Sequence, residues 1–240
     1  MADGQRNEMT FLEKIYYERY TKKSYSLSNV DLIIDYLFKN INKGVYIDLG
    51  CNHPIKFNNT YLLYKRGWSG INIDSDFDSI KLFNKFRSND FNIRNIVSDD
   101  ESVKKLYYYH KRSALNTLSK DLVDSRTSKP SKIIKEKSVT LNKIIEDSPY
   151  QNSKINLLSV DIENHEFEAL KNFNFLKYKV DVLAVESTDT SQKKLEMYNQ
   201  SINFITKSKV YNLIVKNGYK LINLIHSDLV FVRNDFCQTE

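Results

Sequence analysis

Three apolar, strand-like runs in this chain each close on an aspartate: Asp48, Asp74 and Asp161. In an open α/β sheet, parallel strands present their carboxyl ends at one edge, and ligands bind there. A carboxylate at that edge can hold an amine-bearing group or accept hydrogen bonds from both hydroxyls of a ribose. The three aspartates therefore predict three walls of a single nucleotide-type pocket.

The first of these motifs is Asp48-Leu-Gly50-Cys-Asn52. A glycine at this turn lets the backbone approach a ligand closely, although a tight connection from strand to helix would account for the same residues. A dinucleotide site requires G-x-G-x-x-G, in which three glycines clear space for a pyrophosphate. Because only Gly50 is present, a hydride-transfer cofactor is disfavoured.

Two further acids close strand-like runs. Asp74 ends the run that begins at Gly70, and the tip of a second strand is where a ribose diol is held. The alternative is that Asp74 caps the helix that follows it. Glu186 ends the run 180–185, where a charged residue is unfavourable unless it is paired. Glu186 is therefore expected either to line the acceptor side or to anchor a loop.

The third motif, Asp161-Ile-Glu163-Asn-His165-Glu166, carries acid–base chemistry. While the chain is extended, Asp161 and Glu163 point to the same side. A histidine with an ordinary pKa near about 6.5 can take a proton from an acceptor hydroxyl. Asp161 would then orient that base, hold the acceptor or bind a divalent ion through oxygen. Alternatively, Glu163 and Glu166 stabilise the start of the next helix through its dipole.

The composition bounds the class of protein. A length of 240 residues, with 41% apolar and 28% charged residues, suits one globular α/β domain. The apolar runs are strand-sized and the N-terminal residues lack the apolar core of a signal peptide, so a cytoplasmic protein is expected. Cys51 and Cys237 lie near opposite ends and offer no disulfide framework or zinc spacing.

A formal net charge of +6 raises the question of nucleic acid as a partner. The lysines are scattered among acids from Lys14 to Lys220. The densest basic stretch, 129–137, has no interleaved aromatic residues for stacking on bases. A solvated loop is therefore the favoured interpretation of that stretch, and no nucleic-acid partner is predicted.

Hydrophobic periodicity predicts an alternation of helices and strands. Helices are expected at 11–20, 29–39 (capped by Ser28), 60–65, 78–86, 140–145, 166–173 and 210–217. Strands are expected at 45–49, 70–73, 93–97, 106–109, a short run ending at 139, 155–160 and 180–185, with a closing hairpin of 220–225 and 229–233. The polar stretch 111–132 is predicted to be a loop with little core of its own.

These elements predict a Rossmann-like α/β fold, in which a mainly parallel seven-stranded sheet ends in an antiparallel hairpin and carries helices on both faces. This is the architecture of class I S-adenosylmethionine (SAM) methyltransferases. Residues 1–43 are expected to form N-terminal helices that pack on the active site. Residues 44–240 are expected to form one catalytic unit, with an acceptor-side insertion at about 106–139.

The run from about 24 to 233 resembles the FkbM-type SAM-dependent methyltransferases. The matching pieces share the order and spacing of that family: 45–54 (VYIDLGCNHP), 58–70 (NNTYLLYKRGWSG), 71–74 (INID), 95–99 (NIVSD), 160–166 (VDIENHE), Val185-Glu186, Gly218-Tyr219 and Phe231-Val232. Two departures stand out. Asn164 replaces a glycine that is usual in the family, and Cys51 stands where alanine is usual. The first departure would alter the turn that presents His165.

The resemblance implies a role for each group of residues. Those expected to bind SAM are Asp48, Gly50 and Asn52 at its methionine part, Asp74 at its ribose, Ser98 and Asp99 near its adenine, and Asp161. The acceptor is expected beyond Asp161, His165 and the loop 111–132, with substrate contacts from His53, Asn59 and Glu186. The catalytic group is expected to be His165, Asp161 and Glu163, with His165 or Asp161 as the base.

The activity implied by the resemblance is O-methylation of a sugar hydroxyl, in the tailoring of nucleotide sugars or of capsule and lipopolysaccharide glycans. A divalent metal is not predicted, and the oligomeric state, a homodimer included, is left open. Two alternatives remain: a non-catalytic SAM-binding partner in a glycan pathway, and a nucleic-acid methyltransferase. The presence of all three aspartates, Asp48, Asp74 and Asp161, argues against a non-catalytic partner. Only the net positive charge supports a nucleic-acid methyltransferase.

Overall fold

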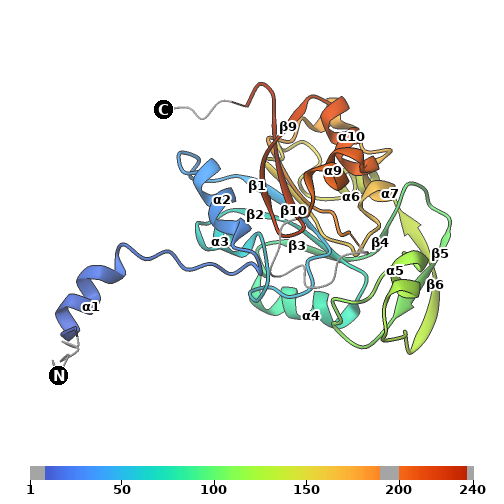
Figure 1. Ribbon diagram of the computed structural model, residues 1–240, viewed down its shortest axis with the longest axis horizontal. Helices are drawn as coiled ribbons and strands as arrows, with labels where there is room; N and C mark the ends of the chain where they lie inside the picture. Colours follow the sequence, from blue (N-terminus) through green and yellow to red (C-terminus); the bar gives the residue numbers. More distant parts are fainter. Residues whose placement is uncertain (1–8, 190–199, 237–240) are drawn as a thin grey trace.

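A seven-stranded sheet lies at the centre of the protein, in the strand order β3-β2-β1-β7-β8-β10-β9 (Figure 1). The structure is a computed structural model that describes residues 9–189 and 200–236, so Cys237 lies outside the described residues. The strands of this sheet are β1 (Val45–Leu49), β2 (Ser69–Asp74), β3 (Phe91–Arg94), β7 (Leu157–Val160), β8 (Val182–Glu186), β9 (Tyr219–Ile225) and β10 (Asp228–Arg233).

The first five strands of that order are parallel, and the hairpin β9–β10 is antiparallel. The predicted architecture of a mainly parallel sheet closed by an antiparallel hairpin is therefore confirmed. Every residue of β7 is buried, as are all residues of β1 except the first. Continuous burial of this kind is typical of parallel strands that are covered on both faces.

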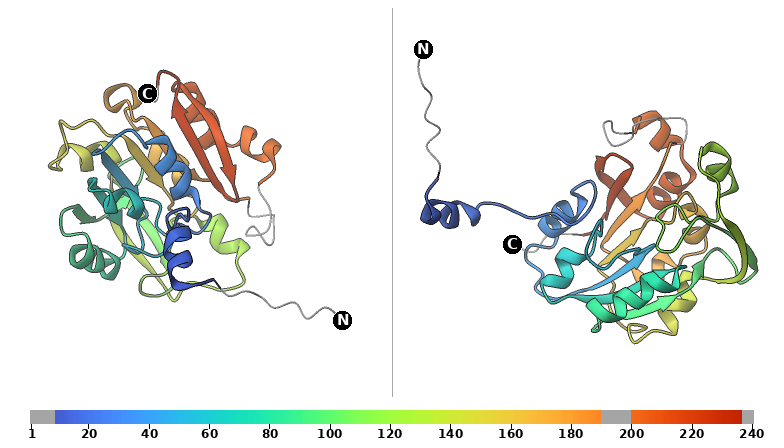
Figure 2. Two further views of the ribbon diagram at one scale, coloured as in Figure 1. Left: turned by 90° about the vertical axis from the view of Figure 1, so that its left-hand side faces the viewer. Right: turned by 90° about the horizontal axis from the view of Figure 1, so that it is seen from below.

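Helices cover both faces of the sheet, as Figure 2 shows from two directions. One core cluster joins the sheet to the side that carries α6, α7, α8 and α10, a second joins it to α2, and a third, smaller cluster packs α4 against Cys51. The described helices are α1 (Phe11–Glu18), α2 (Val30–Leu37), α3 (Tyr61–Lys65), α4 (Phe77–Phe86), α5 (Lys120–Ser125), α6 (Leu141–Glu146), α7 (Glu166–Leu170), α8 (Phe175–Tyr178), α9 (Ile202–Lys207) and α10 (Lys209–Lys216).

A second, three-stranded sheet was not predicted. It has the order β4-β6-β5 and is formed by β4 (Ile96–Val97), β5 (Val103–Tyr108) and β6 (Lys132–Val139). The expected single strand 93–97 is wrong, because the chain leaves the central sheet after Arg94 and Ile96–Val97 pairs with β6 instead. The expectation that 111–132 is a loop with little core of its own is wrong for one part of the stretch, which forms α5 with Leu122 and Val123 buried.

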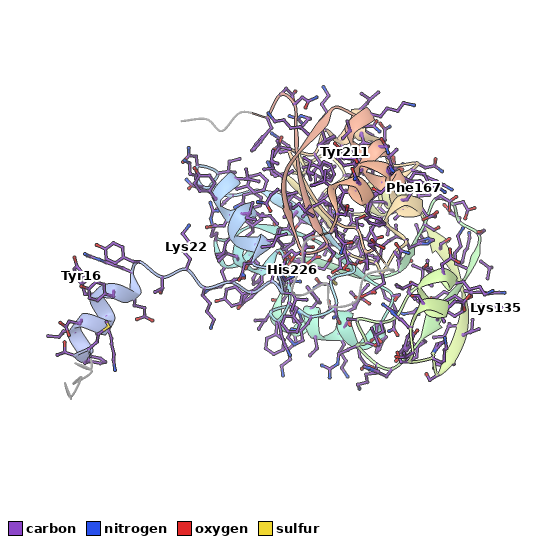
Figure 3. All side chains as sticks on the ribbon, viewed as in Figure 1. Tyr16, Lys22, Lys135, Phe167, Tyr211 and His226 are labelled. Atoms are coloured by element: carbon purple, nitrogen blue, oxygen red, sulfur yellow. The ribbon has the colours of Figure 1, made fainter. Side chains whose placement is uncertain are left out.

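The N-terminal helices differ in their packing. Val30, Ile34 and the following Phe38 bury one face of α2 in the core, whereas no residue of α1 is buried. Figure 3 shows Tyr16 of α1 well apart from the body of the protein that bears Lys135 at its far side. That residues 1–43 cover the active site stays a prediction.

The predicted cap of α2 is wrong. Its N-cap residue is Asn29 in the left-handed conformation, without a side-chain cap, because the hydroxyl of Ser28 donates to the carboxylate of Asp228 at the start of β10. No helix in the described ranges is long and apolar enough to cross a membrane.

Candidate active site

A pocket lies at the carboxyl ends of β1, β2 and β7. Part of its wall is apolar, from Leu49, Ile73, Ile96, Val97 and Leu106. Six of the predicted site residues line it: Gly50, Asn52, Asp74, Asp161, Glu163 and His165. The structure therefore brings the tips of three predicted strands into one pocket.

Gly50 is required by the approach of two strand ends. Its φ is +84°, and a Cβ atom at this position would lie 1.7 Å from the carbonyl oxygen of Asp161. The neighbouring backbone is tied across the same junction, because the amide of Asp161 donates to the carbonyl of Leu49 at 2.9 Å. Glycine alone tolerates both the conformation and the contact. The glycine turn thus closes the floor of the pocket between β1 and β7.

Asp48 lies beneath the pocket and does not line it. Its carboxylate accepts hydrogen bonds from Asn58 Nδ2 at 2.9 Å and from the hydroxyl of Thr60 at 2.8 Å. The buried guanidinium of Arg87 in turn donates to both Asn58 and Thr60. Burial raises the pKa of Asp48, and the charge of Arg87 opposes that rise. In this structure Asp48 anchors the segment that leads into α3.

Asp74 faces the pocket from the end of β2. Its two carboxylate oxygens accept the backbone amides of Asn52 at 2.8 Å and Asp76 at 2.7 Å. Burial raises the pKa of Asp74 to about 6. The N-cap of α4 is Asp76, so the alternative role of Asp74 as a helix cap is excluded. Each carboxylate oxygen keeps a lone pair that can accept from a ligand hydroxyl.

The turn after β7 carries the predicted acid–base residues, and two of its residues have left-handed backbone conformations. Glu163 has a φ of 57° and Asn164 a φ of 69°. Asparagine is one of the few residues besides glycine that adopt this conformation routinely. Asn164 can therefore occupy the position at which the family that this chain resembles usually has glycine. Glu166 fixes the turn by accepting the amides of Ile162 at 3.0 Å and Asn164 at 3.1 Å.

Glu166 is only 4% exposed, and burial, together with the nearby Glu186 carboxylate, raises its pKa to about 8. The predicted supporting role of Glu166 at the start of the helix thus takes the form of hydrogen bonds to two backbone amides.

His165 stands at the N-cap of α7 and lines the pocket. Its Nε2 lies 3.0 Å from the hydroxyl of Ser98, which in turn lies 2.9 Å from the Asp99 carboxylate. Burial lowers the pKa of His165, so the neutral imidazole, which can accept a proton, is favoured near pH 7. The resemblance places Ser98 and Asp99 near the adenine of SAM. In the structure both residues lie behind His165 and do not line the pocket.

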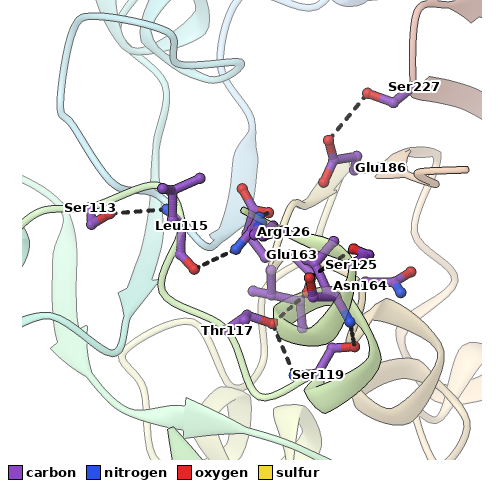
Figure 4. A network of polar contacts seen from close by, with 12 residues as sticks. Ser113, Leu115, Thr117, Ser119, Ser125, Arg126, Glu163, Asn164, Glu186 and Ser227 are labelled. Atoms are coloured by element: carbon purple, nitrogen blue, oxygen red, sulfur yellow. Dashed lines mark hydrogen bonds and ion pairs between the residues drawn. The ribbon is translucent and has the colours of Figure 1, made fainter. Parts of the chain in front are cut away.

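Three carboxylates converge beside the pocket. Oxygen atoms of Asp161, Glu163 and Glu186 lie within 4.8 Å of one another, a spacing at which they could share a divalent cation. Asp161 is open to the pocket but surrounded by protein, and burial, followed by the charges of Glu186 and Glu163, raises its pKa well above the ordinary value. Ser227 donates to Glu186 at 3.1 Å, as Figure 4 shows.

The insertion, which was expected on the acceptor side, forms a roof over the pocket. Residues of the segment 113–118 line it from the side opposite the strand tips. The hydroxyl of Thr117 donates to the carbonyl of Glu163 at 2.6 Å, and Arg126 pairs with the Glu163 carboxylate (Figure 4). Burial and Glu186 raise the pKa of Glu163 to about 8, and Arg126 opposes the rise.

The predicted substrate residues lie outside this pocket. His53 Nδ1 accepts the amides of Ile55 at 3.1 Å and Lys56 at 3.0 Å, and therefore shapes the loop after β1. Asn59 donates to the hydroxyl of Ser159 at 3.2 Å. Contacts of His53, Asn59 and Glu186 with a substrate stay predictions.

Comparisons with known proteins bear on the same region. A family model described as the methyltransferase FkbM domain matches residues 48–221, a range that contains the strand tips and the roof. Among solved structures, the chain is similar to a TehB-like SAM-dependent methyltransferase from Corynebacterium glutamicum ATCC 13032 Kitasato. The identity is 11% and the TM-score 0.42, over 92% of this chain and 95% of that chain. No curated protein sequence matches the chain.

Proposed function

This chain belongs to the methyltransferase FkbM domain family, and from that membership we propose that it transfers a methyl group from SAM to a hydroxyl of a sugar. SAM-dependent methyl transfer follows from the family. The observation that carries the choice of a hydroxyl acceptor is the position of His165. This neutral imidazole lines the same pocket as the carboxyl groups of Asp161 and Glu163.

The side chains that line the pocket suit the chemistry of SAM. Apolar side chains along one wall suit a purine ring, and the Asp74 carboxylate at the end of β2 suits the two ribose hydroxyls. Asn52 and Asp161, on the neighbouring strand tips, offer polar partners for an amino acid moiety. When bound, SAM supplies a methyl group on a sulfonium, which makes that carbon intrinsically electrophilic.

The residues of this chain would then align an oxygen and remove its proton. A positioned base of this kind contributes typically about 10²–10⁴-fold to a reaction rate. His165 is the favoured base, because burial keeps its imidazole neutral, whereas burial and mutual repulsion favour the protonated form of Asp161. The roof segment 113–118 would keep water from the reacting groups.

The acceptor proposed is a sugar, within a nucleotide sugar or a surface glycan of the capsule or lipopolysaccharide type that is modified in the cytoplasm. Carboxyl groups form hydrogen bonds with hydroxyls whether they are ionised or protonated, and Asp161, Glu163 and Glu186 present several such oxygens within a small space. A polyhydroxylated ring offers several groups that both donate and accept, so it can satisfy these carboxyls together. A ligand without hydroxyl groups offers fewer such partners.

The direct test is a screen for S-adenosylhomocysteine formation with nucleotide sugars and glycan fragments as acceptors. A matched set of nucleic acids and the same sugars with blocked hydroxyls serve as controls. We expect product only with the free hydroxyls. Product with the nucleic acids alone would contradict the sugar proposal while leaving the methyltransferase assignment in place.

A further inference from the structure

We propose that Asp99 and Ser98 are positioning residues that fix His165 in the tautomer protonated at Nε2, leaving Nδ1 as the basic nitrogen for the acceptor. The proposal rests on the proposed function for the use of that base, but the tautomer itself does not depend on it. The three groups form one chain, from the Asp99 carboxylate through the Ser98 hydroxyl to His165 Nε2, with separations of 2.9 Å and 3.0 Å.

The first step is the charge of Asp99. Its carboxylate lies 2.6 Å from the ammonium of Lys171 and 3.2 Å from that of Lys104. An ammonium only donates, so both contacts require Asp99 to accept. Its backbone carbonyl is also held, by Asn172 Nδ2 at 2.9 Å. Asp99 is therefore a fixed, ionised acceptor at one end of the chain.

The second step is the single proton of the Ser98 hydroxyl. The oxygen of Ser98 lies 2.9 Å from an oxygen of the ionised Asp99, and two oxygens at that distance need a proton between them. Asp99 has no proton to give, so Ser98 donates to it. The Ser98 oxygen can therefore offer His165 Nε2 only a lone pair. In this second hydrogen bond the imidazole Nε2–H donates and the Ser98 oxygen accepts.

The third step is the consequence for the imidazole. A neutral histidine that is protonated at Nε2 has its lone pair on Nδ1. Among the described residues, Ser98 is the one hydrogen-bond partner of the His165 side chain, so Nδ1 is left for a ligand. Ser98 is 1% exposed and its own amide donates to Val139 at 3.2 Å, so the hydroxyl is held in place.

The test is imidazole ¹⁵N–¹H nuclear magnetic resonance on the full chain without ligand. The sequence has four histidines, and a His165→Gln variant assigns the signal of interest. We expect the Nε2-protonated tautomer in the wild type, with an Nε2 proton that is protected from exchange with water. Protonation at Nδ1 in the wild type would overturn the proposal.

Two variants separate this inference from a merely structural role. Ser98→Ala should expose the Nε2 proton to exchange, whereas Ser98→Thr, which keeps the hydroxyl, should preserve its protection. Asp99→Ala frees the Ser98 proton to turn toward Nε2, so the share of the Nδ1-protonated tautomer should rise. The signals of the other three histidines report whether each variant is folded. Unchanged exchange in Ser98→Ala and an unchanged tautomer in Asp99→Ala would refute the assignment.

Kinetics with an acceptor found in the screen add a second readout. Ser98→Ala should lower kcat by about 10-fold or more, because it disorders the base, while KM for SAM stays within about 2-fold of wild type. An unchanged kcat would contradict the positioning role. Failure of the proposed function itself would appear differently, as no turnover by the wild type together with the expected tautomer.

Discussion

The hydroxyl of Thr117 donates to the carbonyl oxygen of Glu163 at 2.6 Å, and this bond joins the roof of the pocket to the turn that presents the acid–base residues. Thr117 is also held by backbone pairing with Tyr107 of β5. The small sheet, the roof and the turn after β7 are thereby connected. A movement of the insertion would therefore displace Glu163 and, two residues further along the chain, His165.

Removing the Thr117 hydroxyl should loosen this connection. Thr117→Val keeps the shape of the side chain and leaves the Glu163 carbonyl without its partner, which costs about 1–3 kcal/mol for a buried group. We expect a lower melting temperature and a higher KM for the acceptor. Thr117→Ser, which retains the hydroxyl, is the control and should behave like the wild type. Equal behaviour of the Val and Ser variants would show that the bond does not hold the roof.

Truncating His165 should separate chemistry from binding. His165→Ala removes the favoured base, so kcat is expected to fall by about 10²–10⁴-fold, while calorimetric affinity for SAM changes little. His110→Ala is a suitable control, because His110 is exposed and its ring hydrogen-bonds to the backbone carbonyl of Lys111. Turnover that is unchanged in His165→Ala would remove this residue from the mechanism.

The buried carboxyl of Glu166 predicts a pH-dependent stability difference. Its pKa is about 8 in the folded protein, above the value of about 4.3 in an unfolded chain. The folded state therefore binds this proton more tightly than the unfolded state does. The stability that the proton contributes to the wild type is lost as the pH rises from about 4.3 through about 8. Glu166→Gln keeps the acceptor oxygen for the amides of Ile162 and Asn164 but cannot ionise.

The free energy of unfolding of Glu166→Gln should consequently improve, relative to wild type, between about pH 5 and about pH 8.5. Urea denaturation at several pH values measures the difference, with Glu101→Gln at an exposed position as the baseline. A difference that does not change with pH would show that Glu166 is ionised throughout.

The left-handed turn predicts a simple order of stabilities at residue 164. Asn164 has a φ of 69°, a conformation that a β-branched residue adopts only with strain. Asn164→Val should destabilise the protein by about 1–2 kcal/mol, whereas Asn164→Gly, the matched control, should be close to neutral. Thermal unfolding checks both variants. A Val variant as stable as the Gly variant would contradict the left-handed assignment.

The strand tips could be predicted from the sequence because strong periodic signals surround them. The runs that end at Asp48, Asp74 and Asp161 are almost wholly apolar, and parallel strands of this kind converge at one edge. The direction in which Asp48 points could not be predicted. It depends on Asn58, Thr60 and the buried Arg87, whose side chains meet only in the folded protein.

The conformation of the roof could not be predicted for a related reason. Its stretch is polar and has no hydrophobic period, because hydrogen bonds from side chains order it. The carboxamide of Asn116 accepts the amide of Tyr109 at 2.9 Å, and Arg126 donates to the carbonyl of Leu115 at 2.7 Å. Side-chain bonds to backbone groups of this kind leave no periodic trace in a sequence. The pairing of Ser98 with His165, 67 positions apart, was hidden in the same way.

The central claim is that the pocket at the strand tips binds SAM through Asp74, and calorimetric titration tests it most directly. SAM and S-adenosylhomocysteine would be titrated into wild type, Asp74→Ala and the control Asp147→Ala, whose aspartate pairs with Lys143 on the surface. We predict micromolar binding to wild type and control, weakened at least about tenfold in Asp74→Ala, which corresponds to about 1.4 kcal/mol. Equal binding by Asp74→Ala, or no binding by the wild type, would contradict the account.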